Sequence, residues 1–258
     1  MERMKREFSM WKALVYRQWF LGRKMVILGC IMGVGSSVLL LLVLLSFYYG
    51  NLALLPKADK TLLLGELGIV MKCLPALAFG GLPFVLAETD VKCETKKWTC
   101  FRISTPATAG RVTFARYSLI IGLLFLCGLV SYGFSYLGDS ILGETDHNLA
   151  LHITLCFFAV YTLFSVSMQV FTGLFASQDK GGLCTMGVMG ILAAVFVSYN
   201  KNGLLAEFPL SDSAEEIFNL QRIQNLLEKV SPGAVVLLIL TLVCGYIATC
   251  FLYKRREK

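Results

Sequence analysis

Long, uninterrupted apolar runs constrain this chain more than any other feature of its sequence. The first of them extends from Met25 to Tyr49 without one charged side chain. About 20 consecutive apolar residues are enough for a helix to cross the hydrocarbon core of a bilayer. Backbone polar groups in lipid must bond within the protein, so only helices and closed barrels span it, and barrel strands would alternate apolar and polar residues. The runs therefore predict membrane-spanning helices.

The composition agrees with this interpretation. Of the 258 residues, 56% are apolar and 16% are charged, whereas a soluble domain has roughly 45–50% apolar and about 25% charged residues. We expect an all-α integral membrane protein that forms one transmembrane domain over residues 1–258. Its six expected spans lie at about 25–49, 67–87, 117–138, 151–176, 183–199 and 233–253.

Two further segments are amphipathic and too polar to span. In residues 1–24 the apolar face is formed by Phe8, Trp11, Val15 and Trp19, which predicts an amino-terminal interfacial helix that lies on membrane lipids. The alternative is an ordinary helical start of the first span. In the second segment, Ser213 and Glu216 have the spacing of a capping box and Pro232 closes the run. This pattern predicts an outer helix over 213–230, between spans five and six.

The distribution of Lys and Arg predicts the orientation. Segments 1–24, 88–116, 177–182 and 254–258 together carry 18 of them, segments 50–66, 139–150 and 200–232 carry 5, and Lys72 completes the 24. Because Lys and Arg gather on the cytoplasmic side, we expect a multi-pass protein of the plasma membrane with both termini in the cytoplasm. The net charge of +7 is then a topology signal, and we expect no nucleic-acid partner.

Polar residues within the expected spans mark candidate functional positions. Thr162, Ser165, Gln169 and Thr172 recur on one face of span four. They either pack against other helices or line a transport path, and the residues leave both open. Lys72 either extends to the headgroups or faces an aqueous path. Span two also holds Pro75, Pro83 and a Gly80–Gly81 pair, so we expect it to be kinked or partly unwound.

Catalytic constellations are missing from the sequence. It has no motif of a serine hydrolase, a zinc protease or a phosphate-binding loop. Its two histidines, His147 and His152, are five residues apart and so do not share a helical face as metal ligands. We find no ionisable groups near the middle of a span, which disfavours an ion-coupled carrier. We therefore expect no enzyme activity and no bound cofactor or metal in this chain.

The loop over 88–116 carries a family resemblance. Its stretch from Glu88 to Trp98, ETDVKCETKKW, is followed by Ser104-Thr-Pro106 and by the segment from Arg111 to Tyr117. Together with the six spans, this loop resembles the first cytoplasmic loop of type-2 permeases of ATP-binding cassette (ABC) exporters. The compact form is also similar to bacterial exporters of amphipathic peptides, including peptide toxins and lantibiotics.

The resemblance implies a mechanism and partners. Two six-helix permeases, here expected to be a homodimer, would form the channel, and separate cytoplasmic ATPase subunits would bind the ATP and Mg²⁺. The 88–116 loop would contain a coupling helix seated on the ATPase, with the 177–182 turn as a smaller contact. The residues implied in coupling are Glu88, Asp90, Lys96, Lys97, Trp98, Phe101 and Arg102.

The spans contain almost no fixed charge, which suits amphipathic or hydrophobic cargo. The resemblance to peptide exporters implies peptide as the cargo class. Two other functions remain open at this point. One is a non-transporting membrane sensor or immunity scaffold, and the other is an intramembrane enzyme, which the missing catalytic constellation disfavours.

Overall fold

A computed structural model describes residues 2–50, 57–83, 108–143, 148–175, 177–200 and 220–256. These residues form six α-helices and no strand. The helices are α1 (Glu2–Tyr49), α2 (Lys57–Gly80), α5 (Ala109–Leu142), α6 (Asn148–Phe175), α7 (Gln178–Asn200) and α9 (Leu220–Arg256).

Five of the six helices are long and apolar enough to cross a membrane: α1, α2, α5, α6 and α9. Among the described residues, the prediction of a helical fold with helices able to span a membrane is thereby confirmed. The expected span at 183–199 lies within α7, which is helical but is not among these five. The count of six spans therefore stays a prediction.

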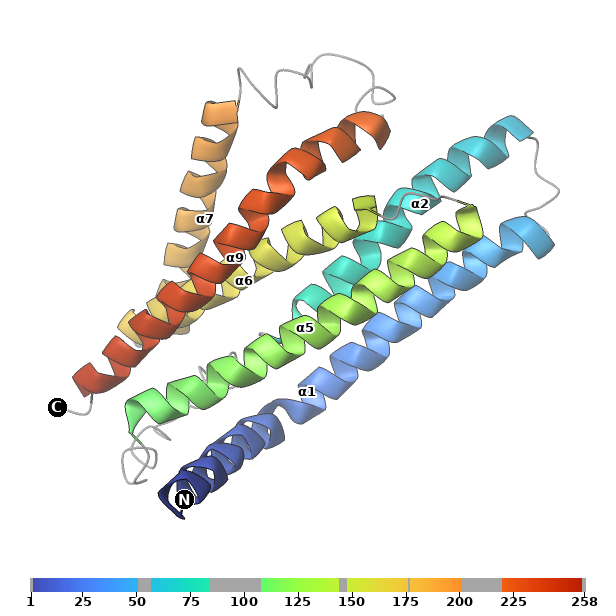
Figure 1. Cartoon of the computed structure of the whole chain (residues 1–258). Coiled ribbons are helices and arrows are strands. Elements are labelled where there is room, and N and C mark those ends of the chain that lie inside the picture. Colours follow the sequence, from blue (N-terminus) through green and yellow to red (C-terminus); the bar gives the residue numbers. More distant parts are fainter. Residues whose placement is uncertain are drawn as a thin grey trace.

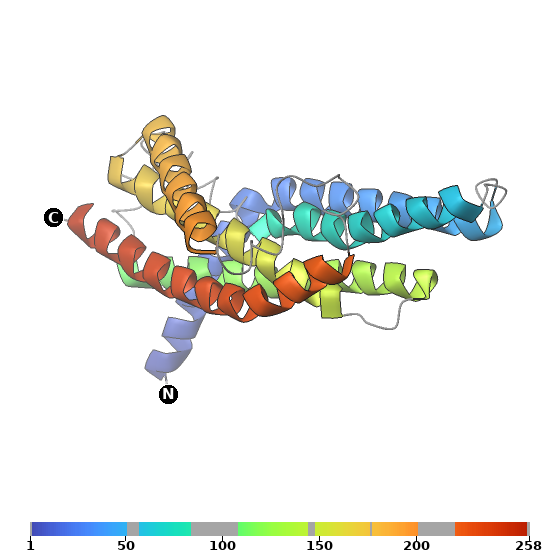
Figure 2. The same cartoon turned by 90° about the horizontal axis from the view of Figure 1, so that it is seen from above.

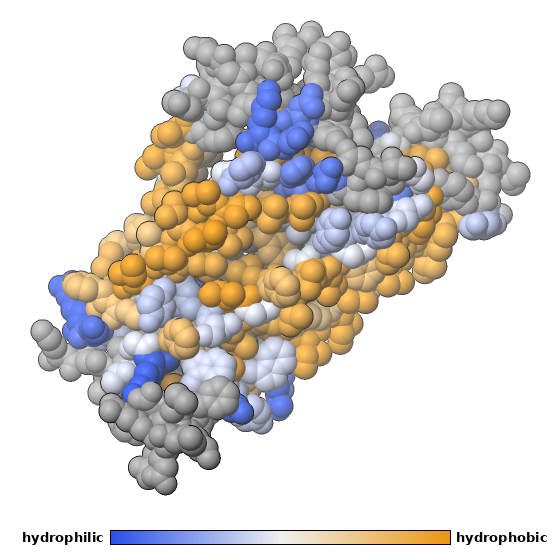
Figure 3. All heavy atoms as spheres, in the orientation of Figure 1, coloured by the Kyte–Doolittle hydropathy of each residue, from blue (hydrophilic) through white to orange (hydrophobic). Residues whose placement is uncertain are grey.

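The helices form two groups that meet along α2, α5 and α6. Helices α1, α2 and α5 pack against one another, α6 packs on α9 and α7, and α2 and α5 connect the groups through α6. The start of α1, the start of α5 and the end of α9 lie at one end of the bundle (Figure 1). Hydrophobic side chains cover the middle of the face shown in Figure 3, and hydrophilic ones gather toward its ends.

The first helix differs from the prediction of a separate interfacial helix over residues 1–24. Helix α1 is continuous from Glu2 to Tyr49. No proline separates the basic segment from the first apolar run, and Gly22 at their junction stays within the helix. Its amino-terminal part points away from the rest of the bundle (Figure 2). Trp11, Val15 and Trp19 are half-buried on it, while Lys12 and Arg17 are exposed. The side chain of Phe8 lies outside the described residues.

The predicted break at Pro232 is wrong. Helix α9 passes through Pro232 without interruption, so residues 220–230 of the expected outer helix belong to the same helix as span six. Residues 213–219 lie outside the described part. Proline has no N–H and leaves the carbonyl four residues earlier without its helical donor. The Ser231 hydroxyl donates to that carbonyl, Glu228 O, at 3.3 Å, which replaces the missing bond.

Helix α5 is longer than expected at both ends. It begins at Ala109, so the last eight residues of the expected 88–116 loop are helical. It ends at Gly143, whose φ of 76° is left-handed and whose N–H bonds the carbonyls of Asp139 and Ser140. Glycine favours this conformation at a helix end. Asp139, which we expected in an outer loop, is therefore part of the helix.

Small residues allow close contact between α1 and α2. Gly29 faces Leu82, which follows α2, and a Cβ placed on Gly33 would lie 3.0 Å from the Phe79 ring. Further in, the ring of Phe79 stacks on Phe134 of α5 with centroids 6.2 Å apart. A core of Phe79, Leu82, Ile120, Leu124, Cys127, Phe158 and Val166 then joins α2, α5 and α6.

We expect Gly33→Val to destabilise the purified protein by about 1–3 kcal/mol, because the added methyl groups overpack the α1–α2 contact. Thermal unfolding in detergent measures the effect. Gly35→Val is the matched control, since no atom lies within 4 Å of a Cβ at Gly35. Equal stability of the two variants would contradict the close helix contact.

Candidate functional site: a buried ion pair and a polar stripe

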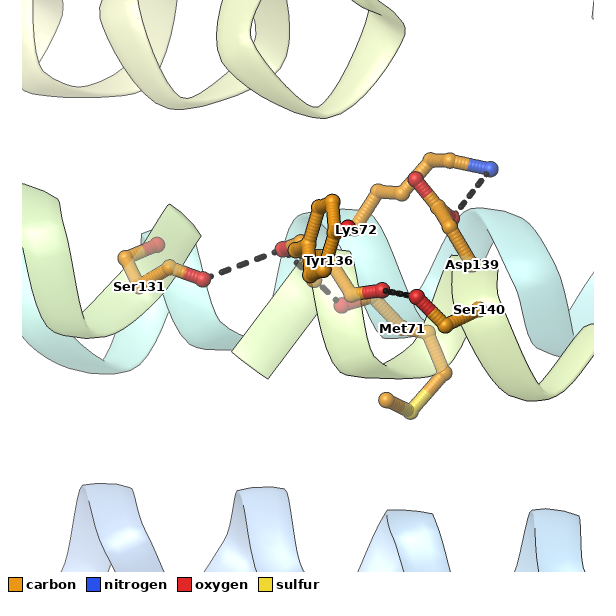
Figure 4. Close-up of polar contacts among 7 residues, drawn as sticks. Met71, Lys72, Ser131, Tyr136, Asp139 and Ser140 are labelled. Atoms are coloured by element: carbon orange, nitrogen blue, oxygen red, sulfur yellow. Dashed lines mark hydrogen bonds and ion pairs between the residues drawn. The ribbon is translucent and has the colours of Figure 1, made fainter. Parts of the chain in front are cut away.

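A buried ion pair joins α2 to α5. The ammonium Nζ of Lys72 lies 3.0 Å from Oδ1 of Asp139, and the two side chains are 1% and 0% exposed. Figure 4 shows the pair on the side of the α2–α5 contact that faces away from α1, while Met71 points the other way. An ionisable pair within apolar helices is a functional-site candidate, since such groups are costly to keep in a membrane.

Close packing of α2 and α5 brings the two charges together. A Cβ on Gly138 would lie 2.7 Å from the Met71 side chain, so this glycine permits the approach. The Ser135 hydroxyl donates to Ser131 O at 3.1 Å and lies 3.4 Å from Met71 O (Figure 4). Because Met71 and Gly138 precede Lys72 and Asp139, the close contact sets the position of the pair.

The position of Asp139 explains why it requires a cation. It lies in the last turn of α5, next to the Gly143 cap, where the carbonyl end of the helix dipole carries partial negative charge. A carboxylate at that end, removed from water, is unfavourable unless a positive group opposes it. Lys72 supplies that charge, so each residue makes the burial of the other tolerable.

Two sequence expectations are corrected here. The Lys72 side chain does not extend to the headgroups, because it is enclosed by protein. The expectation that Asp139 lies in an outer loop is also wrong, because α5 extends to Leu142 and the Asp139 side chain is buried against Lys72. Reading helix three up to Gly143, the first glycine after Asp139 that suits a left-handed cap, would have included Asp139.

The polar stripe of α6 faces protein. Thr162, Gln169 and Thr172 are buried and Ser165 is half-buried. The neighbours come from two helices: Val166 contacts Gly245 of α9, and Thr172 packs against Gly181 of α7. Burial excludes a lipid-facing stripe, whereas its role in a transport path stays a proposal.

Two members of the stripe lack hydrogen bonds within the part of the chain that the structure describes. They are Gln169, through both amide atoms, and Thr172, through its hydroxyl. Thr162 differs, because its hydroxyl donates to Phe158 O at 2.6 Å. A buried polar group with no partner costs stability and requires an explanation. Gln169 and Thr172 are therefore the members best suited to contact water or cargo.

Sequence reasoning missed a second polar contact near the start of α5. Thr113 and Arg116 are buried there, although we expected them in the charged loop. Next to them, the hydroxyls of Tyr117 and Thr249 lie 3.4 Å apart, and the ring of Tyr117 meets that of Tyr246 edge-on at 5.7 Å. These contacts connect α5 to α9 at the end of the bundle where both chain ends lie (Figure 1).

The candidate residues thus fall into separate places. Lys72 lies at the α2–α5 contact, and the α6 stripe lies at the contact with α7 and α9. The seven residues implied in ATPase coupling, Glu88, Asp90, Lys96, Lys97, Trp98, Phe101 and Arg102, lie outside the described residues. Within the described ranges, no group of three His, Cys, Asp or Glu side chains is placed to hold a metal ion.

Comparisons with protein-family models, with curated proteins and with solved structures found no match for this chain.

We expect Lys72→Met alone, or Asp139→Leu alone, to lower the free energy of unfolding by about 3–5 kcal/mol, because each leaves one buried charge unopposed. The double variant should recover most of this loss. Denaturant unfolding in detergent measures the three variants, and Glu66→Gln, an exposed position on α2, is the control. A double variant as unstable as the sum of the single ones would show that the two residues do not interact.

For Gln169→Leu we expect unchanged or increased thermal stability, because an apolar side chain of similar size removes an unbonded amide from the α6 contact. The same thermal unfolding assay checks it. A loss of about 1 kcal/mol or more would mean that the Gln169 amide is hydrogen-bonded in the folded protein, and would contradict the prediction.

Proposed function

We propose that this chain is the membrane-spanning permease subunit of an ATP-driven ABC exporter. It would move amphipathic or hydrophobic cargo, with peptide as the expected class, out of the cytoplasm or the membrane. The observation that carries the proposal is the resemblance of the charged loop after α2 to the first cytoplasmic loop of type-2 permeases. The helical membrane architecture supports it.

The arrangement of the basic residues is consistent with a cytoplasmic docking face. Lys12 near the start of α1, Arg111 at the start of α5 and Arg255 at the end of α9 are all exposed. These three helix ends lie at one end of the bundle (Figure 1). In the proposal this end faces the cytoplasm across the plasma membrane, as the Lys and Arg distribution predicts.

The energy source lies outside this chain. A cytoplasmic ATPase subunit would hold ATP and Mg²⁺ and would contact the 88–107 segment. Trp98 and Phe101 would be the apolar anchors of that contact, and Lys96, Lys97 and Arg102 its charged rim. Closure of two ATPase subunits would move the attached helices and alternate access to the path.

A second copy of the chain would complete the pore. The α6 stripe, with Gln169 and Thr172 unbonded within the described residues, is the proposed lining of the path in each copy. Helix α7 presents exposed apolar side chains beside it, among them Leu183, Met186 and Ile191, which would meet lipid or the second copy.

Purification of the tagged full chain from its native membrane tests the proposal. We expect an ATPase subunit to accompany it, and the pair reconstituted in liposomes to move a fluorescent amphipathic peptide only with ATP. Trp98→Ala should reduce the associated ATPase by at least about tenfold, since loss of an aromatic anchor costs about 2 kcal/mol or more.

Charge reversal at Lys96 and Lys97 should have a similar effect, because it replaces attraction at the rim by repulsion. Reversal at Lys57 and Lys60 is the matched control, since these two cations lie in the first turn of α2, at the end of the bundle opposite to the proposed docking face (Figure 1). Purification without any ATPase, or undiminished association of the Trp98 and Lys96/Lys97 variants, would contradict the proposal.

One observation favours a second candidate function, an ion-coupled carrier. The Lys72–Asp139 pair is enclosed by apolar helices, and buried ionisable residues of this kind mark proton and ion pathways in transporters. The liposome assay separates the two candidates. Transport driven by a proton or sodium gradient without ATP, and lost in Asp139→Asn, would favour the carrier.

A further inference from the structure

A cleft opens where the amino-terminal part of α1 meets the start of α5 and the end of α9. It measures about 370 Å³ and is lined by Met10, Trp11, Leu14, Gly110, Arg111, Phe114 and Tyr246. Neither the ion pair nor the α6 stripe contributes to it. We propose that this cleft binds one anionic phospholipid, with the phosphate at Arg111 and an acyl chain on its apolar walls.

The chemistry of the walls selects an amphiphile. Six of the seven lining residues carry apolar or aromatic side chains or, at Gly110, none, and the seventh is Arg111. A guanidinium offers several N–H donors in a plane and matches a phosphate group well. Trp11 and Tyr246 are of the kind that lies at headgroup level, with an apolar ring and a polar tip.

The start of α5 adds positive potential to the same place. Arg111 is in the first turn of this helix, which carries no acidic residue, and the N-cap Thr108 makes no side-chain capping bond. The N–H groups of a first turn carry partial positive charge. Lys12 and Arg17, exposed on the neighbouring α1, extend the cationic surface. These charges favour an anionic headgroup over a zwitterionic one.

A path for the acyl chain leads away from the charged end. Phe114, which lines the cleft, is 55% exposed, and Ile121 and Phe125 on the same side of α5 are 50% and 68% exposed. Their spacing of seven and four residues keeps them on one helical face. This apolar ridge continues from the cleft along the membrane-crossing part of α5. A free phosphate has no acyl chain that could contact this ridge, so the occupant is a lipid of the adjacent leaflet.

Native mass spectrometry of the full chain in mild detergent tests the assignment. The probes are phosphatidylglycerol and phosphatidylcholine with identical acyl chains, titrated separately. We expect one phosphatidylglycerol to be retained about fivefold more tightly than phosphatidylcholine, as one basic contact near a membrane surface provides.

Two variants separate the effect of the charge on Arg111 from the effect of the open space beside Gly110. Arg111→Gln should abolish the preference for phosphatidylglycerol. Gly110→Leu should weaken retention of both lipids, because no atom lies within 4 Å of a Cβ at Gly110 and the leucine side chain would occupy part of the cleft. The controls are Arg255→Gln, an exposed cation outside the cleft, and Gly122→Leu, which likewise has open space around its Cβ. Both controls should bind as the unaltered chain does.

Several results would overturn the proposal. Equal retention of the two lipids would assign the cleft to a neutral acyl chain or to another segment of this protein. Loss of preference in Arg111→Gln together with full retention in Gly110→Leu would reduce the effect to attraction by surface charge. An effect of Arg255→Gln as large as that of Arg111→Gln would lead to the same conclusion.

Discussion

In a bilayer, every backbone N–H and C=O must find its partner inside the protein, and the rest of this structure depends on that constraint. It accounts for helices that continue where a soluble chain would break. Helix α9 crosses Pro232 because the Ser231 hydroxyl donates to the carbonyl that proline leaves open. Helix α5 ends at Gly143, whose left-handed conformation lets its N–H bond the preceding turn.

The same constraint applies to charges. Lys72 and Asp139 are enclosed by apolar helices and oppose each other at 3.0 Å. Their burial depends on backbones that approach closely, which Gly138 permits against Met71. The α2–α5 contact is thus held by small residues and by two charges that each destabilise the fold without the other. This interaction gives the two helices a fixed register.

The other polar groups of the bundle lie in two places, between helices and near the helix ends. The α6 stripe lies between helices, where Gln169 and Thr172 have no hydrogen bond within the described residues. The basic residues collect near the ends of α1, α5 and α9. The proposed transport path along the α6 stripe and the proposed lipid site at Arg111 use different residues, so the two are compatible.

Part of this could be predicted from the sequence. The apolar runs determined a helical membrane protein, because span length and the need for internal hydrogen bonds are local properties of a segment. The same reasoning selected Lys72 and the α6 stripe, since polar residues in such runs are rare.

Only the tertiary structure decided what these residues contact. The partner of Lys72 is Asp139, 67 residues away in sequence. From sequence alone, a charged residue at the end of an apolar run is assigned to a loop, and only the packing of α2 on α5 shows that Asp139 is buried. The bond from the Ser231 hydroxyl to Glu228 O, beside Pro232, is likewise seen only in the folded helix. The cleft at Arg111 needs three helices that no local pattern places together. Periodicity describes one helix at a time, whereas partners, burial and cavities arise between helices.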